Sequence, residues 1–503
     1  MDRRTFVKAA AAGLGAAALG APAARADQPN LTLPSLGIEP KAPRTPIKHL
    51  VVVMMENRSV DHYLGWYGKE NKAFDGTQTH SYVDRRPGRG NKVVHTENWG
   101  AGGRNDLNAR FFKDPDHGWD GGRYQRHGGK MDQWLGPGTG NDEFALSTYN
   151  ARDLPLWAQL TRGWQTYDRW FCGVLGPTQP NRYYLYSGQS HGLKDNTLPP
   201  ELASTHPEWL AGFDWPTVWD LCSNGGVSTS YYFSNLPETA FWGYRQLHRT
   251  HHVSEYFAQC QLGTLPQLSI IDPWFTGPSG IANDDHPLAD IRLGQQFLSD
   301  VTEAFVTSPH YHEGALVITY DEWGGFWDHV APPRVADDRG TDKDPGGKDD
   351  FAQLGFRIPS TIISPWTRHH QVDHTVYNHA SILRFVSDNW GMPYLTKRVR
   401  HSNSIEGAFR RFATFDPHPD LVPYRISPDV QLQMVVDATT DQLKQGHVPS
   451  LIPSKAPATP PMSDLHRLAE TGWFDHLDVN IDHRFEDGFL RPSDILEALS
   501  AKA

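Results

Sequence analysis

Cysteine is scarce in this chain. The 503 residues include three cysteines, Cys172, Cys222 and Cys260, which permit at most one intramolecular disulfide and leave one thiol over. None of them belongs to a C-x-x-C pair. The sequence therefore excludes a disulfide framework and gives no sign of a cysteine-ligated zinc site or a thiol redox site. Each cysteine is expected to be a small buried residue.

Positive charge is also in short supply. The chain has 47 Lys and Arg against 58 Asp and Glu, which gives a formal net charge of −11. Because binding to nucleic acid depends on a basic surface that neutralises phosphates, we do not expect nucleic acid as a partner. An acidic protein still accepts a small anionic substrate where a metal ion or an arginine reverses the local charge.

Long apolar runs are missing beyond the N-terminus. The one present, Ala9 to Ala24, is rich in Ala and Gly and too short to cross a bilayer comfortably. It follows the twin-arginine signature Asp2-Arg3-Arg4-Thr5-Phe6-Val7-Lys8 and ends at Ala24-Arg25-Ala26, an A-x-A cleavage site. We therefore expect residues 1–26 to be a Tat signal peptide, with the Tat translocon as a partner during export and a periplasmic or secreted mature protein.

The remaining sequence predicts an α/β fold. Residues 27–46 are predicted to be a Pro-rich leader, and residues 449–503 are predicted to be a Pro-rich linker and a C-terminal tail. Between them, residues 47–448 carry short β-branched runs typical of strands buried on both faces, and they alternate with helical stretches. The strand-like runs are Ile47–Met55, Leu268–Ile271, Ala315–Tyr320 and Ile358–Ile363, and the clearest helical stretches are Pro287–Val306 and Tyr377–Asn389. This alternation predicts a largely parallel central sheet flanked by helices.

Oxygen ligands follow two of these strands directly. Glu56 and Asn57 come after the first run, and Asp321 and Glu322 come after Ala315–Tyr320. Open parallel sheets bind ligands at the carboxyl ends of their strands, and carboxylate and amide oxygens suit a hard or borderline divalent ion. For either pair alone, helix capping or turn formation is the commoner explanation. The metal remains open among Ca, Mg, Mn and Zn.

A third motif, Gly176-Pro177-Thr178-Gln179-Pro180-Asn181-Arg182, adds a candidate nucleophile. Its Gly-Pro turn and Pro180 predict a helix that starts near Pro180, with Thr178 just ahead of the N-terminus, where an anion is favoured. A threonine hydroxyl deprotonated beside a metal attacks phosphorus, and Arg182, one turn later, suits a phosphate oxygen. The alternative is an N-cap threonine and a surface arginine.

These three motifs carry a family resemblance. The segments E-N-R-S-V-D-H after V-V-V-M-M, G-P-T-Q-P-N-R, and D-E-W-G-G-F-W-D-H-V-A-P-P resemble the bacterial phospholipase C and acid phosphatase family of the alkaline phosphatase superfamily. The likeness runs from about Ile47 to about Trp390 and implies an alkaline-phosphatase-like fold. It implies a divalent metal held by Glu56, Asn57, Thr178, Asp321 and Glu322, with Thr178 also the nucleophile.

Two histidine motifs are also similar to the family. Asp116-His117-Gly118-Trp119 resembles a segment whose histidine contacts the phosphate, and Asn283-Asp284-Asp285-His286-Pro287 places Asp285 and His286 near the reaction centre. The resemblance thus implies His117, Asp285 and His286 as catalytic residues, since a histidine there protonates a leaving group. His329 is expected, with Arg182, to bind substrate or else to orient its loop. Val60, Trp323 and Trp327 depart from the family's usual Phe, His and Tyr.

The function expected from these residues is metal-dependent phosphoester hydrolysis. The favoured form is a phospholipase C that cleaves phospholipid to diacylglycerol and a phosphorylated head group through a phospho-threonine, with peripheral membrane contact. An acid phosphatase acting on small phosphomonoesters is the first alternative, and Thr178 in place of Ser favours the phospholipase. A sulfatase is excluded because threonine cannot become formylglycine. A non-catalytic exported binding protein is the other alternative, although no expected ligand or nucleophile is missing.

Overall fold

The computed structural model describes residues 42–109, 112–199, 212–275, 282–339, 350–409, 421–431 and 433–434. The expected signal peptide, most of the Pro-rich leader and the expected linker and tail lie outside the described residues. Those boundaries therefore stay predictions.

An eight-stranded sheet forms the centre of the molecule, in the order β12-β6-β11-β10-β1-β9-β7-β8. All neighbouring pairs are parallel except those of β11, which runs antiparallel to β10 and β6. The strands are β1 (His49–Met55), β6 (Gln165–Tyr167), β7 (Thr229–Phe233), β8 (Thr250–His252), β9 (Leu268–Ile271), β10 (Gly314–Tyr320), β11 (Thr361–Ile363) and β12 (Val372–Asp373). The predicted α/β fold with a largely parallel sheet is confirmed.

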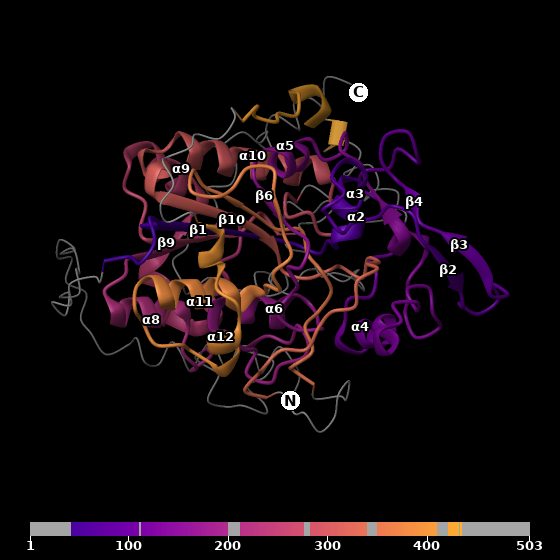
Figure 1. Ribbon diagram of the computed structural model, residues 1–503, viewed down its shortest axis with the longest axis horizontal. Helices are drawn as coiled ribbons and strands as arrows, with labels where there is room; N and C mark the ends of the chain where they lie inside the picture. The colour runs from indigo at the N-terminus through magenta and orange to yellow at the C-terminus, as the bar shows by residue number, and fades with distance from the viewer. Residues whose placement is uncertain are drawn as a thin grey trace, which may run out of the picture.

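Helices cover both faces of this sheet (Figure 1). One layer contains α5 (Pro155–Gly163), α9 (Val253–Leu262) and α10 (Ile291–Thr307). The other contains α6 (Thr178–Ser187), α8 (Val218–Gly225), α11 (His379–Asn389) and α12 (Lys397–His401). Because both faces are covered, β1 and β10 are buried along nearly their whole length, which explains their continuous apolar sequences.

Short elements gather beyond the end of β1. They are α2 (Val60–Leu64), α3 (Tyr67–Glu70) and α4 (Trp119–Arg126), the antiparallel pair β2 (Ser81–Asp84) and β3 (Lys92–His95), and the pair β4 (Glu97–Asn98) and β5 (Ser147–Thr148). The 3-10 helices are η1 (His127–Gly129), η2 (Glu143–Leu146), η4 (Glu238–Arg249), η5 (Pro309–Glu313) and η6 (Ile405–Ala408). In Figure 1 the β2–β3 ribbon projects from this end of the molecule.

Two predicted helices are present with later starts. The helix expected over Pro287–Val306 begins at Ile291 because Asp290 caps it, its side chain accepting from the Arg292 backbone N–H. The one expected from Tyr377 begins after Asn378, which forms a capping box with Ser381. All three cysteines are buried, as predicted, and none of them forms the one disulfide that the sequence left open. No helix among the described residues combines the length and apolar character needed to cross a membrane.

Candidate active site

The sheet register brings the two predicted pairs of oxygen ligands together. β1 and β10 are adjacent and parallel, and their last residues, Met55 and Tyr320, are partners. The Asp321 N–H donates to the Met55 carbonyl at 2.9 Å, which continues the ladder one residue past the strand. Glu56 and Asp321 therefore leave the sheet side by side, each followed by a second potential ligand.

Four buried atoms at these strand ends have no hydrogen-bond partner among the residues that the structure describes. They are Asn57 Oδ1 and Nδ2, Asp321 Oδ2 and Glu322 Oε1. The opposite carboxylate oxygens are fixed by backbone N–H groups, since Asp321 Oδ1 accepts from Asn57 and Glu322, and Glu322 Oε2 accepts from Gly324. Each unpaired buried group costs about 1–3 kcal/mol. One oxygen of each carboxylate is thus oriented by the backbone, and the other is available to an ion.

The buried negative charges at this site also favour the binding of a cation. Glu56, Asp321 and Glu322 are all buried. Burial, and then the neighbouring Glu56 carboxylate, raise the pKa of Asp321 well above its usual value, and burial, and then Asp321, do the same to the pKa of Glu322. A divalent ion would relieve this repulsion and satisfy the unpaired oxygens. The residues present fit such an ion.

Tight turns hold the two strand ends against each other. Asn57 has a positive φ of 60°, and Gly324 and Gly325, which follow the second pair of ligands, have φ values of 63° and 72°. A Cβ on Gly324 would lie 2.2 Å from the Asn57 carbonyl oxygen. Only glycine allows this approach without strain. The Gly-Gly sequence therefore sets the position of the Asn57 side chain.

Arg182 is bound by protein carboxylates. Its Nε and Nη2 lie 2.9 and 2.6 Å from Glu56 Oε1, and its Nη1 lies 2.9 Å from Asp272 Oδ1. The side chain is fully buried, so the alternative of a surface charge is wrong. This geometry gives no support to a phosphate contact. Instead, Arg182 joins α6 to Glu56, which the sequence predicts to be a metal ligand.

Thr178 is the first residue of α6, which begins two residues earlier than the position of Pro180 predicted. The loop before it is closed by Asn181, whose Oδ1 accepts from the Val174 N–H and whose Nδ2 donates to the Gly176 carbonyl, at 2.9 and 2.7 Å. Thr178 lies on the same helix face as Arg182, four residues later, which reaches Glu56. The Arg182–Glu56 contact thus anchors α6, which Thr178 begins, to the end of β1.

Asp114, His117 and His286 form a cluster beside these ligands. One ligand atom from each of the three lies within 4.8 Å of the others, and the two imidazole rings are 6.0 Å apart. The Asp114 charge is one of the causes that raise the pKa of Glu322, so the cluster adjoins the strand-end carboxylates. Each imidazole Nδ1 donates to a backbone carbonyl, of Pro115 and Pro287, which leaves both Nε2 atoms unprotonated in the neutral rings. Sequence reasoning missed Asp114, although it lies three residues before His117.

Asp285 is enclosed by other groups. Its Oδ2 accepts from the Tyr320 hydroxyl at 2.5 Å, and a Cβ on Gly294 of α10 would lie 1.9 Å from its Oδ1. Burial raises the pKa of this carboxyl to about 6, although Arg58 and the two hydroxyls of Tyr320 and Tyr63 lower it. The structure thus supports a positioning role for Asp285, which precedes His286, and not contact with a substrate.

His329 is held between two carboxylates. Its Nδ1 lies 2.5 Å from Asp61 Oδ2, and its Nε2 lies 3.0 Å from Asp75 Oδ1. Burial lowers the pKa of His329, but the hydrogen bond to Asp61 and the charges of Asp61 and Asp328 raise it to about 9. Of the two roles expected for His329, this geometry favours orientation of the loop after Glu322. Trp323 and Trp327 are buried beside it as packing residues, with their Nε1–H groups bonded to Gln125 and Ser147.

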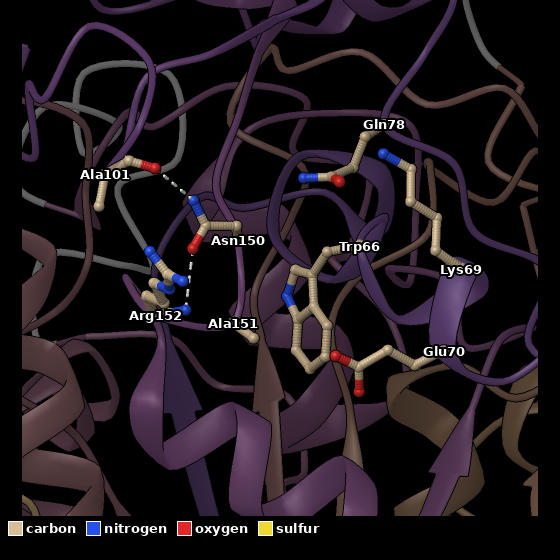
Figure 2. Close-up of a pocket in the computed structure, with 8 residues that line it drawn as sticks. All are labelled: Trp66, Lys69, Glu70, Gln78, Ala101, Asn150, Ala151 and Arg152. Atoms are coloured by element: carbon tan, nitrogen blue, oxygen red, sulfur yellow. Dashed lines mark hydrogen bonds between the residues drawn. The ribbon is translucent and has the colours of Figure 1, made fainter.

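A surface hollow of about 330 Å³ lies apart from these residues (Figure 2). It is lined by Trp66, Lys69, Glu70, Gln78, Ala101, Asn150, Ala151 and Arg152. Several of its polar groups are already bonded: Asn150 Nδ2 donates to the Ala101 carbonyl, and Glu70 pairs with Arg162. None of the expected site residues lines it.

Known proteins are similar to this chain over most of its length. Residues 47–393 match the Phosphoesterase family. Non-specific phospholipase C6 of Arabidopsis thaliana is 31% identical over 409 residues, which cover 74% of each chain. Phospholipase C B of Mycobacterium tuberculosis is 27% identical over 401 residues, which cover 69% of this chain and 74% of its own.

Among solved structures, a protein in the alkaline phosphatase superfamily from Vibrio parahaemolyticus matches 89% of this chain and 97% of its own, with 10% identity and a TM-score of 0.34. That structural likeness is too distant to carry an argument. The family match spans well over half of the 503 residues and contains every residue of the candidate site. The chain therefore belongs to the phosphoesterase family of phosphoric ester hydrolases.

Proposed function

We propose that this protein is a metal-dependent phospholipase C that cleaves a phospholipid to diacylglycerol and a phosphorylated head group through a phospho-Thr178 intermediate. The observation that carries the proposal is the set of buried atoms on Asn57, Asp321 and Glu322 that have no hydrogen-bond partner among the described residues. They follow the same strand ends as Glu56, which Arg182 of α6 binds. The names of the relatives, a non-specific phospholipase C and a phospholipase C, support the choice of substrate.

The metal would be held by Glu56, Asn57, Asp321 and Glu322, with Thr178 as a further ligand. When bound, it would lower the pKa of the Thr178 hydroxyl and withdraw charge from the phosphate. Arg182 neutralises and orients Glu56 and makes no contact with the substrate. Backbone N–H groups of Asn57, Glu322 and Gly324 fix the carboxylates before any substrate arrives.

In this mechanism Thr178 gives its hydroxyl proton to solvent, Oγ1 attacks phosphorus in line, and the bond between phosphorus and the diacylglycerol oxygen breaks. His117 or His286, in its doubly protonated form, donates the Nε2 proton to that oxygen, since Nδ1 of each ring is bonded to a backbone carbonyl. Water then attacks the phospho-threonine, the same histidine accepts a proton from it, and the phosphorylated head group leaves. Asp114 carboxylate oxygens lie 3.9 Å from His117 Nδ1 and from His286 Nε2.

The test compares hydrolysis of p-nitrophenyl-phosphocholine and p-nitrophenyl phosphate by the mature protein. We expect Thr178→Ala and EDTA treatment each to reduce diester cleavage by at least about 10³-fold, since each removes a group required for covalent catalysis. Thr307→Ala, on the exposed end of α10, is the matched control and should retain full activity.

The other outcomes of this assay distinguish the alternative functions. A preference for the monoester would identify an acid phosphatase that uses the same site. Activity of Thr178→Ala equal to that of the control would show that Thr178 is not the nucleophile. If neither substrate nor natural phospholipid were cleaved, the non-catalytic alternative would be correct.

Export is a separate proposal that rests on residues 1–26. We infer that the Tat pathway carries the folded protein out of the cytoplasm. Replacing Arg3 and Arg4 with lysine should retain the protein in the cytoplasmic fraction, because the twin arginines are the recognised signal. Unchanged export of the double variant would overturn this assignment.

A further inference from the structure

A second histidine cluster lies at the opposite end of β1. His49 is the first residue of that strand, and His310 and Glu313 belong to η5, which leads directly into β10. One ligand atom from each of these three side chains lies within 4.8 Å of the others. Glu56 follows the last residue of β1, so at about 3.3 Å per residue the cluster is roughly 20 Å from the candidate active site.

The two imidazole rings lie close together, at an interplanar angle of 36°. Their ring centroids are 3.8 Å apart. His49 Nδ1 donates to the Pro266 carbonyl at 3.0 Å, which fixes the ring and leaves the lone pair of Nε2 available. Metal-binding histidines typically make this kind of contact through their second nitrogen. His310 Nε2 is buried and has no hydrogen-bond partner among the described residues.

The charges are also compatible with a bound cation. Glu313 supplies the negative charge. Its Oε2 lies 2.6 Å from Lys48 Nζ, but the Lys48 side chain is 55% exposed and can turn into solvent when an ion binds.

We propose that His49, His310 and Glu313 bind a structural divalent transition-metal ion, of the zinc class, at the amino edge of the sheet. Two imidazole nitrogens and one carboxylate oxygen form a three-ligand set that zinc accepts, with water as the fourth ligand. Such an ion would tie together the starts of β1 and β10, and through Pro266 the segment that leads into β9. A stacked histidine pair alone would leave the buried His310 Nε2 without a partner.

The test measures zinc binding to EDTA-stripped protein in an Asp321→Asn background, which removes the proposed catalytic ion. We expect this protein to bind one equivalent of zinc. His49→Ala and His310→Ala should each weaken that binding by at least about 100-fold, because loss of an outer partner alone costs 10- to 100-fold. His312→Ala, an exposed histidine in the same η5, is the matched control and should bind as the background does.

Two further measurements separate metal binding from damage to the fold. Glu313→Gln preserves the shape of the side chain and should still weaken zinc binding, and cobalt added to the Asp321→Asn protein should give visible absorption bands that His310→Ala abolishes. Phosphoester hydrolysis by His310→Ala with the catalytic ion supplied should equal that of His312→Ala. Equal zinc affinity in His310→Ala and His312→Ala, or absorption bands unchanged by His310→Ala, would overturn the proposal and leave the proposed active site untouched.

Discussion

Replacement of Arg182 would show whether this residue serves the substrate or the fold. It is the cation nearest to Glu56, Asp272 and Glu238, at 2.6, 2.9 and 3.6 Å, and both it and these carboxylates are buried. Removing one partner of a buried ion pair typically costs 3–5 kcal/mol. For Arg182→Gln we therefore expect a loss of about 4 kcal/mol in the free energy of unfolding, or more if all three carboxylates stay ionised. In a chain of this size that corresponds to a fall in the melting temperature of roughly 5 °C.

The assay combines thermal unfolding with metal titration of the same samples. Arg182→Lys preserves the charge but loses the double contact of Nε and Nη2 with Glu56, so it should recover only part of the stability. Metal affinity should fall in both variants, because Glu56 loses the group that orients it. A melting temperature within 1 °C of the wild type, together with a rise in KM alone, would refute this reasoning and restore the phosphate-binding role expected from the sequence.

Three further predictions concern the turn, the histidine network and the metal. Gly324→Ala should lower the free energy of unfolding by more than about 2 kcal/mol and reduce activity, because its Cβ would collide with the Asn57 carbonyl at a φ of 63°. Gly407→Ala, whose Cβ would have nothing within 4 Å, should change the free energy of unfolding by less than about 0.5 kcal/mol. Chemical unfolding of both variants measures the difference. The pKa of His329 is about 9 in the folded protein, so its contribution to the free energy of unfolding, on the order of 2–3 kcal/mol, should be complete below pH 6.5 and lost as the pH rises through 9. The free energy of unfolding of His329→Gln, measured from pH 6 to 10, should lack this decline. A decline parallel to that of the wild type would contradict the assignment. Removal of metal by EDTA should lower the melting temperature at pH 7.5, with recovery on adding back a divalent ion, and an unchanged melting temperature would show that the strand-end carboxylates do not hold one.

The central strands were predictable because their apolar runs reflect burial on both faces. β1, β9 and β10 all coincide with such runs. The fourth run, Ile358–Ile363, gave a strand that begins only at Thr361, because Pro359 has no N–H for a ladder. The short strands β6, β7, β8 and β12 carry no comparable run, and their conformation depends on pairing with neighbours far away in the sequence.

The positions of site residues were predictable where those residues directly follow a strand. Glu56, Asn57, Asp321 and Glu322 follow strands that pair in register, so placing the strands also placed the ligands. The environment of Arg182 was predictable only in part. Asp272 directly follows β9, which pairs with β1, but Glu238 lies in η4 and Arg182 itself in α6. The proximity of both carboxylates to Arg182 depends on tertiary packing, which a short sequence motif does not predict. The same holds for Asp61 and Asp75 around His329.

Labelling of the three buried thiols would report local unfolding of the native protein. Cys172 and Cys222 are inaccessible, and Cys260 nearly so, and burial raises the pKa of Cys222 and of Cys260 to about 12. A thiol-specific reagent therefore meets almost no reactive thiolate in the native state and labels only molecules in which a segment has opened. Cys222 lies in α8, Cys260 lies in α9 and Cys172 precedes α6, so their separate labelling rates would compare the opening of the two helical layers without any engineered probe.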